Sequence, residues 1–429
     1  MTKYKLSAIA LALMTSVPAL AASQADSAGF VEDSSLDLFL RNAYISRDYK
    51  HGAQDKAEWG QGASLTFQSG FTQGLVGFGV DAFGLYGVRL DSGRGRAGAG
   101  GIDFFKLNSN AAGDIESVDD DMAHAGAALK ARFSKTVIAY GDQRPALPVL
   151  SHDDSRLLPE AFTGTLITSE EIDGLVVHAG RFTAEHRKSD EGRDSGKLKS
   201  IEVLGGSYRF NDNLSAALYA SDVEDRLKRH YVNMNYVRPL NEGDALTLDF
   251  NGYRTNYDND FEALAGGEKN RIWSLSANYA TGAHDFTLAY QRSSGDAGYQ
   301  YGFYQSEDWV GDGGTTIWLA NSYWSDFNAK DERSWQVAYG RNFADYGMPG
   351  LNYRVAYVRG TDIDDGTGSG AGTEREFFNQ LQYVVQSGAA KDLSVRLRSS
   401  ALRVSNNASK YNTGGNEVRV FVDFPMNIF

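Results

Sequence analysis

The stretch EVRVFVDFPMNIF, residues 417–429, decides the fold of this chain of 429 residues. Its residues alternate in polarity, with Val418, Val420, Val422 and Phe424 on one side of an extended chain and Glu417, Arg419 and Asp423 on the other. Successive side chains of a strand point to opposite faces, so the pattern predicts a strand with one apolar and one polar face. A barrel in lipid must pair its last strand with its first, because an open edge leaves backbone groups unsatisfied. We interpret this stretch, which stops on an aromatic residue, as the closing strand of a transmembrane β-barrel. The alternative is the last strand of an ordinary β domain.

The N-terminal residues have the pattern of a secretory signal. Lys3 and Lys5 precede an apolar run from Leu6 to about Val17, and the small-x-small sequence Ala19-Leu20-Ala21 follows. The run is too short for a membrane span and leads into a cleavage site, so it predicts a Sec signal peptide over residues 1–21. We therefore expect an exported mature chain, residues 22–429.

Composition excludes several classes of protein. The chain has no cysteine, so a disulfide framework is excluded. After the signal, no segment approaches the roughly 18 apolar residues of a membrane-spanning helix. The 47 Gly, 23 Tyr and 23 Phe, against 7 Pro, suit strands joined by turns. A formal net charge of −13 argues against nucleic acid as a partner. Because we find no composition break and no Pro/Ser linker, we expect one domain over residues 22–429.

Segments of alternating polarity recur along the chain, mostly about 9–13 residues long, which is the span of a tilted transmembrane strand. We expect about eighteen of them, at 36–47, 58–69, 74–90, 125–133, 135–143, 162–171, 173–184, 199–210, 213–223, 229–238, 244–255, 271–281, 283–292, 333–343, 350–360, 374–386, 392–404 and 416–428.

The connections between these segments alternate in length. Every second one is tight, for example at residues 211–213 and 281–282, whereas most of the others are long and polar, notably 91–124, 144–161 and 293–332. Short periplasmic turns and long extracellular loops are typical of outer-membrane barrels, and a soluble sandwich or propeller has no reason to sort its loops in this way. The sequence therefore predicts an all-β fold: an 18-stranded antiparallel transmembrane β-barrel, closed between residues 36–47 and 416–428.

The two faces of several strands can be assigned. In 392–404, Val395 and Leu397 point one way and Arg396 and Arg398 the other. Placing Arg396 in hydrocarbon costs about 2–4 kcal/mol near the bilayer midplane, so the apolar row faces lipid and the arginine row faces the lumen. A barrel of this strand number encloses a water-filled channel.

The loop RPALPVLSHDDSRLLPEA, residues 144–161, holds three of the seven prolines. Proline fixes φ and stiffens a loop, and a stiff loop after an early strand is what a porin folds inward to narrow its lumen. We therefore predict an inward-folded constriction loop that presents Arg144, Pro145, Pro148, Ser151, Asp153, Asp154 and Ser155. The alternative is an external loop that only resists proteases.

Basic residues on lumen-facing positions form the second candidate site. Their predicted members are Lys130 and Arg132 on one strand, Arg396 and Arg398 on the penultimate strand, and Arg419 on the last. The last two strands are neighbours, so their three arginines can form a track on one wall. Arginine keeps its charge and grips a carboxylate with two hydrogen bonds. The alternative is that these arginines pair with lumenal acids such as Asp423 and Glu376 and only solvate the wall.

Signals for catalysis or metal binding are weak. Ser151, His152 and Asp153 are adjacent in sequence, which almost prevents the relay geometry of a catalytic triad. The seven histidines show no HxH or HExxH spacing, and the acidic run Asp119-Asp120-Asp121 suits a solvated loop better than a Ca²⁺ site. We therefore expect no enzyme, no cofactor and no metal.

Several stretches resemble the OprD family of outer-membrane channels. They include GFVEDSSLDLFLRN (29–42), SGFTQGLVGFGVDAFG (69–84), ARFSKTVIAYGDQRPALPV (131–149), SRLLPEAFTG (155–164), LTLDFNGYRTN (246–256), YGMPGLNYRVAYVRG (346–360), LQYVVQSGAAKDLSVRLR (381–398) and NEVRVFVDFP (416–425). The resemblance runs in order through nearly all of the mature chain. It implies an eighteen-stranded, substrate-specific channel of a Gram-negative bacterium for small molecules bearing a carboxylate, although chitosugar-specific relatives exist.

The resemblance also implies roles for particular positions. Arg396 and Arg398 match the RxR of the family's penultimate strand, Arg419 the arginine of its closing strand, and Lys130 and Arg132 its basic fourth-strand positions. The inward-folded third loop corresponds to residues 144–161. The loop at 293–314 varies across the family, so the substrate stays open.

Together these features lead us to expect a substrate-specific outer-membrane porin for passive uptake of amino acids, short peptides or organic and aromatic acids along a lumenal arginine ladder. A barrel hydrolase and an unselective or chitosugar-type porin are the alternatives. The expected partners are small carboxylate substrates, outer-membrane lipid and lipopolysaccharide, and the barrel-assembly machinery, without nucleic acid. We expect a monomer or weak trimer in the outer membrane of a Gram-negative bacterium.

Overall fold

A computed structural model describes residues 23–91, 102–110, 112, 114–241, 243–302, 304, 315–368 and 370–429. The signal peptide expected over residues 1–21 lies outside these ranges. Among the described residues, no helix has the length and apolar character needed to cross a membrane.

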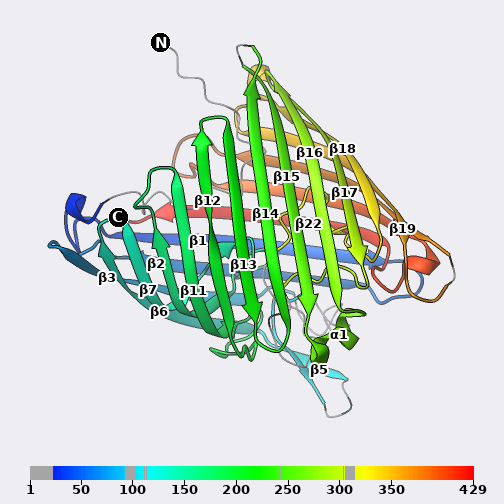
Figure 1. The fold of residues 1–429 in the computed structure, drawn as a ribbon, viewed down its shortest axis with the longest axis horizontal. Helices are drawn as coiled ribbons and strands as arrows, with labels where there is room; N and C mark the ends of the chain where they lie inside the picture. Colours follow the sequence, from blue (N-terminus) through cyan, green and yellow to red (C-terminus); the bar gives the residue numbers. More distant parts are fainter. Residues whose placement is uncertain are drawn as a thin grey trace.

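A single 18-stranded antiparallel sheet forms the body of the described chain (Figure 1). Its strands are β1 (Ser35–Tyr49), β2 (Lys56–Gln68), β3 (Val76–Arg89), β6 (Asp121–Phe133), β7 (Thr136–Gln143), β10 (Ala161–Ser169), β11 (Leu175–His186), β12 (Ile201–Asn211), β13 (Leu214–Val223), β14 (Leu227–Pro239), β15 (Asp244–Tyr257), β16 (Lys269–Thr281), β17 (His284–Gly295), β18 (Arg333–Asn342), β19 (Leu351–Ile363), β20 (Gly372–Val384), β21 (Ser394–Val404) and β22 (Gly415–Asn427). Each predicted strand is present, with boundaries that differ by a few residues, so the predicted fold class is confirmed.

Smaller elements decorate the loops. They are the hairpin of β4 (Leu107–Ser109) and β5 (Ile115–Val118), the hairpin of β8 (Ala146–Leu147) and β9 (Leu150–Ser151), the helix α1 (Asn259–Ala265), and short 3₁₀ turns at Gln24–Asp26, Ala344–Tyr346 and Asn406–Ala408.

The barrel closes between β1 and β22. Their register runs from the pair Asp37 and Asn427 to the pair Tyr49 and Gly415. Pairing continues to the last residue, because the Leu36 amide donates to the Phe429 carbonyl at 3.0 Å and the Ile428 amide donates to the Leu36 carbonyl at 2.8 Å. The sheet therefore has no open edge along this seam, as the closing-strand interpretation requires.

The two faces of the strands divide as predicted. On β17, Phe286 and Leu288 are exposed on the outer face, whereas Asp285 and Gln291 are buried on the inner face. On β21, Val395 and Leu397 are exposed on the outer face. Since hydrocarbon tolerates apolar but not charged side chains, the outer face is suited to lipid.

The connections between strands are long at one end of the barrel and short at the other, as predicted. The barrel end that carries α1 and the β4–β5 hairpin has the long loops, and the C-terminus lies at the other end (Figure 1). Tight turns close that other end, for example at Gly282, whose φ of 56° lies in the left-handed region that favours glycine. By this division, the long loops are extracellular and the short turns periplasmic.

Candidate functional site

The third loop, residues 144–160 between β7 and β10, crosses the inside of the barrel. On one side the Tyr253 hydroxyl of β15 donates to the Pro148 carbonyl at 3.1 Å. On the opposite side Leu157 reaches β2, where a Cβ on Gly60 would lie 2.7 Å from its Cδ2 atom. At Gly62 a Cβ would lie 3.1 Å from the Leu157 carbonyl oxygen. Glycine on β2 therefore makes room for the loop, and the loop folds inward as predicted.

The prolines and serines of the third loop hold its shape. The Pro145 carbonyl accepts from the His152 amide at 2.9 Å. The Ser151 hydroxyl lies 3.1 Å from the Thr315 hydroxyl, which joins this loop to the seventh. The Ser155 amide donates to Asp153 Oδ1 at 2.6 Å.

A buried ion pair anchors the same loop to the loop that follows β11. Lys188 Nζ lies 2.6 Å from Asp153 Oδ2, and both side chains are buried. Burial alone would raise the pKa of Asp153, but Lys188 and Arg156 hold that pKa well below its usual range. The pair therefore stays ionised at neutral pH and fixes the loop across the lumen.

Asp153→Asn is expected to loosen the third loop, because losing one partner of a buried pair typically costs about 3–5 kcal/mol. Single-channel conductance in planar bilayers should rise as the loop leaves the lumen. Asp173→Asn is the matched control, since Asp173 is an exposed periplasmic-end partner of Lys135 at 3.4 Å, and it should leave conductance unchanged. An unaltered conductance in Asp153→Asn would show that the pair does not position the loop.

The same pair has a defined pH dependence. The Asp153 pKa is lower in the folded protein than the value of about 3.9 in an unfolded chain, so its stabilisation is complete above about pH 4. That stabilisation is lost only as pH falls further, through the folded pKa. Conductance of the unmodified channel should therefore stay constant between about pH 5 and 7 as far as this pair is concerned.

The seventh loop, residues 296–332 between β17 and β18, lines the inner wall where it is described. Glu376 of β20 accepts from the Trp324 amide at 3.1 Å, the Ser325 amide at 2.9 Å and the Ser400 hydroxyl at 2.5 Å. Gln291 of β17 donates to the Asp326 carbonyl at 2.8 Å. Sequence reasoning left the role of this loop open, because the partners come from strands distant in the chain. Glu376 therefore holds a loop, and no ion pair joins it to an arginine among the described residues, although its charge still acts on Arg398 at longer range.

The last two strands, β21 and β22, and their neighbour β1 carry arginines on their lumenal face. Arg398 lies directly opposite Arg419 in the β21–β22 register. Glu417 holds Arg419, with Nε–Oε1 at 2.6 Å and Nη2–Oε2 at 3.0 Å. Arg398 stacks on Phe378 at 5.0 Å, and among the described residues no acceptor or carboxylate contacts it. Two cations thus face each other across adjacent strands, and of the two only Arg419 is hydrogen-bonded to a carboxylate, while Glu417 and Glu376 act on Arg398 at longer range.

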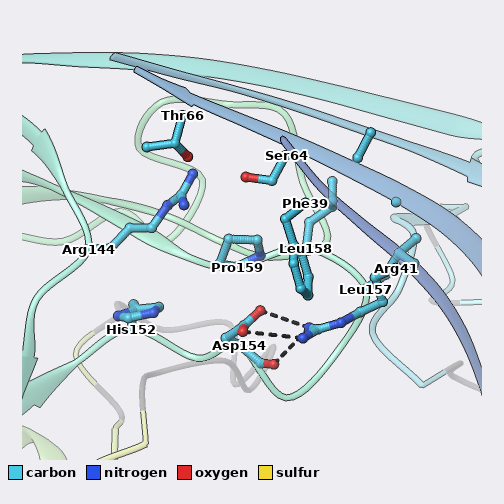
Figure 2. A pocket seen from close by; sticks show the side chains of 12 residues that line it. Phe39, Arg41, Ser64, Thr66, Arg144, His152, Asp154, Leu157, Leu158 and Pro159 are labelled. Carbon is cyan, nitrogen blue, oxygen red and sulfur yellow. Dashed lines mark hydrogen bonds and ion pairs between the residues drawn. The ribbon is translucent and has the colours of Figure 1, made fainter. Parts of the chain in front are cut away.

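The row continues toward the periplasmic end. Arg396 lies opposite Phe421, 5.0 Å from its ring centre, and its Nη2 is 3.7 Å from Asp423 Oδ2. Arg41 of β1 lies opposite Asp423 and bonds it at 2.9 Å. It also reaches the third loop, with Nη1 2.8 Å from Asp154 Oδ1 (Figure 2). Asp423 therefore partners two arginines, as the alternative reading supposed for this acid.

At the extracellular end Arg47 of β1 bonds Glu417 at 2.7 Å. Two residues separate successive levels of the row, so the levels are about 7 Å apart. We call the set Arg47, Arg419, Arg398, Arg396 and Arg41 the arginine ladder. Sequence reasoning missed Arg41 and Arg47, although the predicted closure of the barrel, which places β1 beside β22, was a usable signal.

The structure places Lys130 and Arg132 elsewhere. Both lie on β6, between β3 and β7, and not beside β21 or β22. Lys130 Nζ is 2.5 Å from Asp81 Oδ1. Arg132 donates to Gln24 Oε1 at 3.0 Å and stacks on Phe71 at 4.2 Å, near the periplasmic turn. These two residues are therefore not part of the ladder.

Cavities lie at both ends of the ladder. An extracellular cavity of about 610 Å³ is lined by Arg47, Lys56, Arg156, Lys410 and Asp326 among others. Burial raises the pKa of Asp326, against a hydrogen bond from Ser322 that lowers it. A second cavity of about 220 Å³ lies between the third loop and β1–β2 (Figure 2). The described residues include no cluster of three or more His, Asp or Glu that suits a metal ion.

Comparison with known proteins gives consistent relatives. A family model described as outer membrane porin, OprD family, matches residues 28–428. Porin D of Pseudomonas aeruginosa is 42% identical, with 99% of each chain covered. The structure of OccAB1 of Acinetobacter baumannii superposes with a TM-score of 0.87 at 39% identity, covering 95% of this chain and 99% of that one. The structure of Pseudomonas aeruginosa OpdK with vanillate superposes with a TM-score of 0.79 at 32% identity, covering 93% and 100%.

Proposed function

The chain belongs to the OprD family of outer membrane porins, and on that premise we propose that it selects small solutes bearing a carboxylate and passes them along the arginine ladder. Such a protein is a substrate-specific channel of the Gram-negative outer membrane. The finer proposal concerns which solutes it accepts and which residues select them.

The observation that carries the proposal is the state of Arg398. Its guanidinium lies in the lumenal wall opposite Arg419, and no carboxylate of the described residues contacts it. A guanidinium presents paired N–H donors that match the two oxygens of a carboxylate. An incoming carboxylate therefore gains a partner at Arg398 without displacing a protein group.

The spacing of the ladder supports passage in steps. Levels about 7 Å apart let a carboxylate contact one level before it leaves another. Exposed ion pairs contribute only about 0–1 kcal/mol, which allows release. Conduction requires binding weak enough for the solute to leave. Acids of the wall already pair with the other arginines near Arg398: Glu417 with Arg419, and Asp423 with Arg396 and Arg41. These pairs weaken the attraction of the three arginines for a passing carboxylate.

One relative supports the chemical class. OpdK was crystallised with vanillate, an aromatic carboxylate. The substrate of this chain is therefore sought among aromatic acids, other organic acids, amino acids and short peptides.

A liposome-swelling panel tests the proposal. Aromatic acids, basic amino acids and neutral sugars of similar size are compared, and each acid is paired with its own amide as a neutral control. The acids should enter about fivefold faster than their amides, which corresponds to one exposed ion pair. This preference should weaken as salt rises, because charges are screened over about 8–10 Å near physiological ionic strength.

The other outcomes identify the alternatives. Equal rates for acids, amides and sugars would indicate an unselective porin, and a preference for sugars a chitosugar-type channel. Chemical conversion of a solute by the purified protein would indicate a barrel hydrolase. Each of these results would overturn carboxylate selection.

A further inference from the structure

Arg144, the first residue of the third loop, is a cation that makes no ion pair and no hydrogen bond with the described residues. Its Nε and Nη2 atoms are buried and make no hydrogen bond there, and its guanidinium stacks on Phe83 at 4.3 Å. Burial lowers the pKa of Arg144 to about 10, partly offset by the Asp154 carboxylate. The side chain is therefore still charged at neutral pH. A guanidinium with two buried donors that lack an acceptor is costly, so an anion placed beside it would be stabilised.

Two cavities meet at Arg144. The first is the cavity of about 220 Å³ in Figure 2, where Arg41 and Arg144 lie at opposite ends with Pro159 between them. The second has about 450 Å³ and is lined by Arg144 and Lys130 together with residues of β2, β3, β6, β7 and β10. A volume of 300–1,000 Å³ is typical of sites for small organic ligands, with about 450 Å³ near the lower end.

The second cavity lies on the periplasmic side of the first. Along β2 the first cavity is lined by residues 62–64 and Thr66, and the second by Thr66 and Gln68, so the second extends nearer to the periplasmic turn. A solute that leaves Arg41 through the first cavity therefore meets Arg144 before it reaches the second.

The lining of the second cavity points to a particular ligand chemistry. Lys130 is neutralised by Asp81 at 2.5 Å. Asp142 accepts a hydrogen bond from Thr163 and lies 3.9 Å from Arg193. Arg144 is thus the cation of this lining that makes no ion pair or hydrogen bond with the described residues. Apolar surface comes from Phe71, Phe83, Val137 and Leu166.

We propose that Arg144 and the cavity of about 450 Å³ form an anion-binding subsite under the third loop, which takes a carboxylate joined to an apolar or aromatic body. The carboxylate pairs with the Arg144 guanidinium, and the body lies against the apolar wall. The subsite rests on the proposed carboxylate selection and deepens it, because it discriminates by the body of the solute after the ladder has selected the acid.

The test measures block of single-channel current in planar bilayers by benzoate and by acetate, using the full mature chain. Arg144→Gln should weaken benzoate block about fivefold. Ala139→Leu should weaken benzoate block about threefold and leave acetate block unchanged, because it fills the cavity without altering charge. Lys199→Gln removes one exposed surface charge and serves as the control with unchanged block.

The outcomes separate the subsite from the ladder. If benzoate and acetate block the unmodified channel and Arg398→Gln weakens that block, carboxylate selection stands. In that case, unchanged benzoate block in both Arg144→Gln and Ala139→Leu overturns the subsite alone. If neither acid blocks the unmodified channel, the proposed selection fails and the subsite fails with it.

Discussion

Removal of residues 426–429 is expected to lower the amount of folded barrel in the outer membrane on the order of tenfold or more, because each backbone group left unsatisfied in lipid costs several kcal/mol. The deletion removes the partners of Asp37 and Leu38 on β1. It also removes the two terminal hydrogen bonds that Leu36 makes with Ile428 and Phe429. Export should continue, since the signal peptide predicted at residues 1–21 is untouched. Heat-modifiable migration of outer-membrane fractions on SDS gels measures the folded barrel.

Phe429→Ala is the matched control for this deletion. It keeps the backbone pairing of Leu36 with the last residue and removes only the aromatic ring. An intermediate loss of assembly would assign part of the effect to the ring and the rest to backbone closure. Normal assembly of the shortened chain would contradict the conclusion that the pairing of residues 426–429 with β1 is needed to close the barrel.

Arg398→Gln is expected to reduce the flux of a small carboxylate about fivefold, the equivalent of one exposed ion pair. Arg398 is the ladder residue without an acceptor in the described chain, whereas Arg419 is held by Glu417 at 2.6 Å. Losing this cation leaves the nearby carboxylates in excess, so the ion preference should shift toward cations. Flux is measured by liposome swelling, and ion preference by the reversal potential in a salt gradient.

Arg396→Gln is expected to reduce carboxylate flux by a smaller factor than Arg398→Gln. Arg396 already lies 3.7 Å from Asp423, so its loss should reduce flux less than the loss of Arg398. Lys199→Gln, which removes an exposed charge paired with Asp225, should change neither flux nor reversal potential. Full carboxylate flux and unaltered ion preference in both arginine variants, with normal assembly, would show that the ladder is structural.

The inward fold of the third loop could be predicted in part. Its prolines indicate stiffness, and stiffness is a local property of the chain. Its contacts could not be predicted, because Leu157 meets Gly60 and Gly62 of β2 and Pro148 meets Tyr253 of β15. Those neighbours depend on how far the loop reaches across the lumen, which no local pattern encodes. The seventh loop is the stronger case, since Glu376 binds its backbone from a strand that follows it in the chain.

The site residues divide in the same way. The lumenal face of Arg396, Arg398 and Arg419 follows from their alternation with apolar residues. The same alternation does not show which other basic residues lie beside these arginines. Lys130 and Arg132 also face inward, yet β6 places them beside Asp81 and Gln24 and away from the ladder.

The sequence by itself determined the approximate strand count, the faces of several strands and the sorting of short turns and long loops, because each depends on a two-residue period or on local turn chemistry. The tertiary structure alone decided which side chains share a level of the lumen. Closure set Arg41 opposite Asp423, and register set Arg398 opposite Arg419. The physical reason is that a one-residue slip between strands would keep each pattern legible in sequence while turning every side chain to the other face.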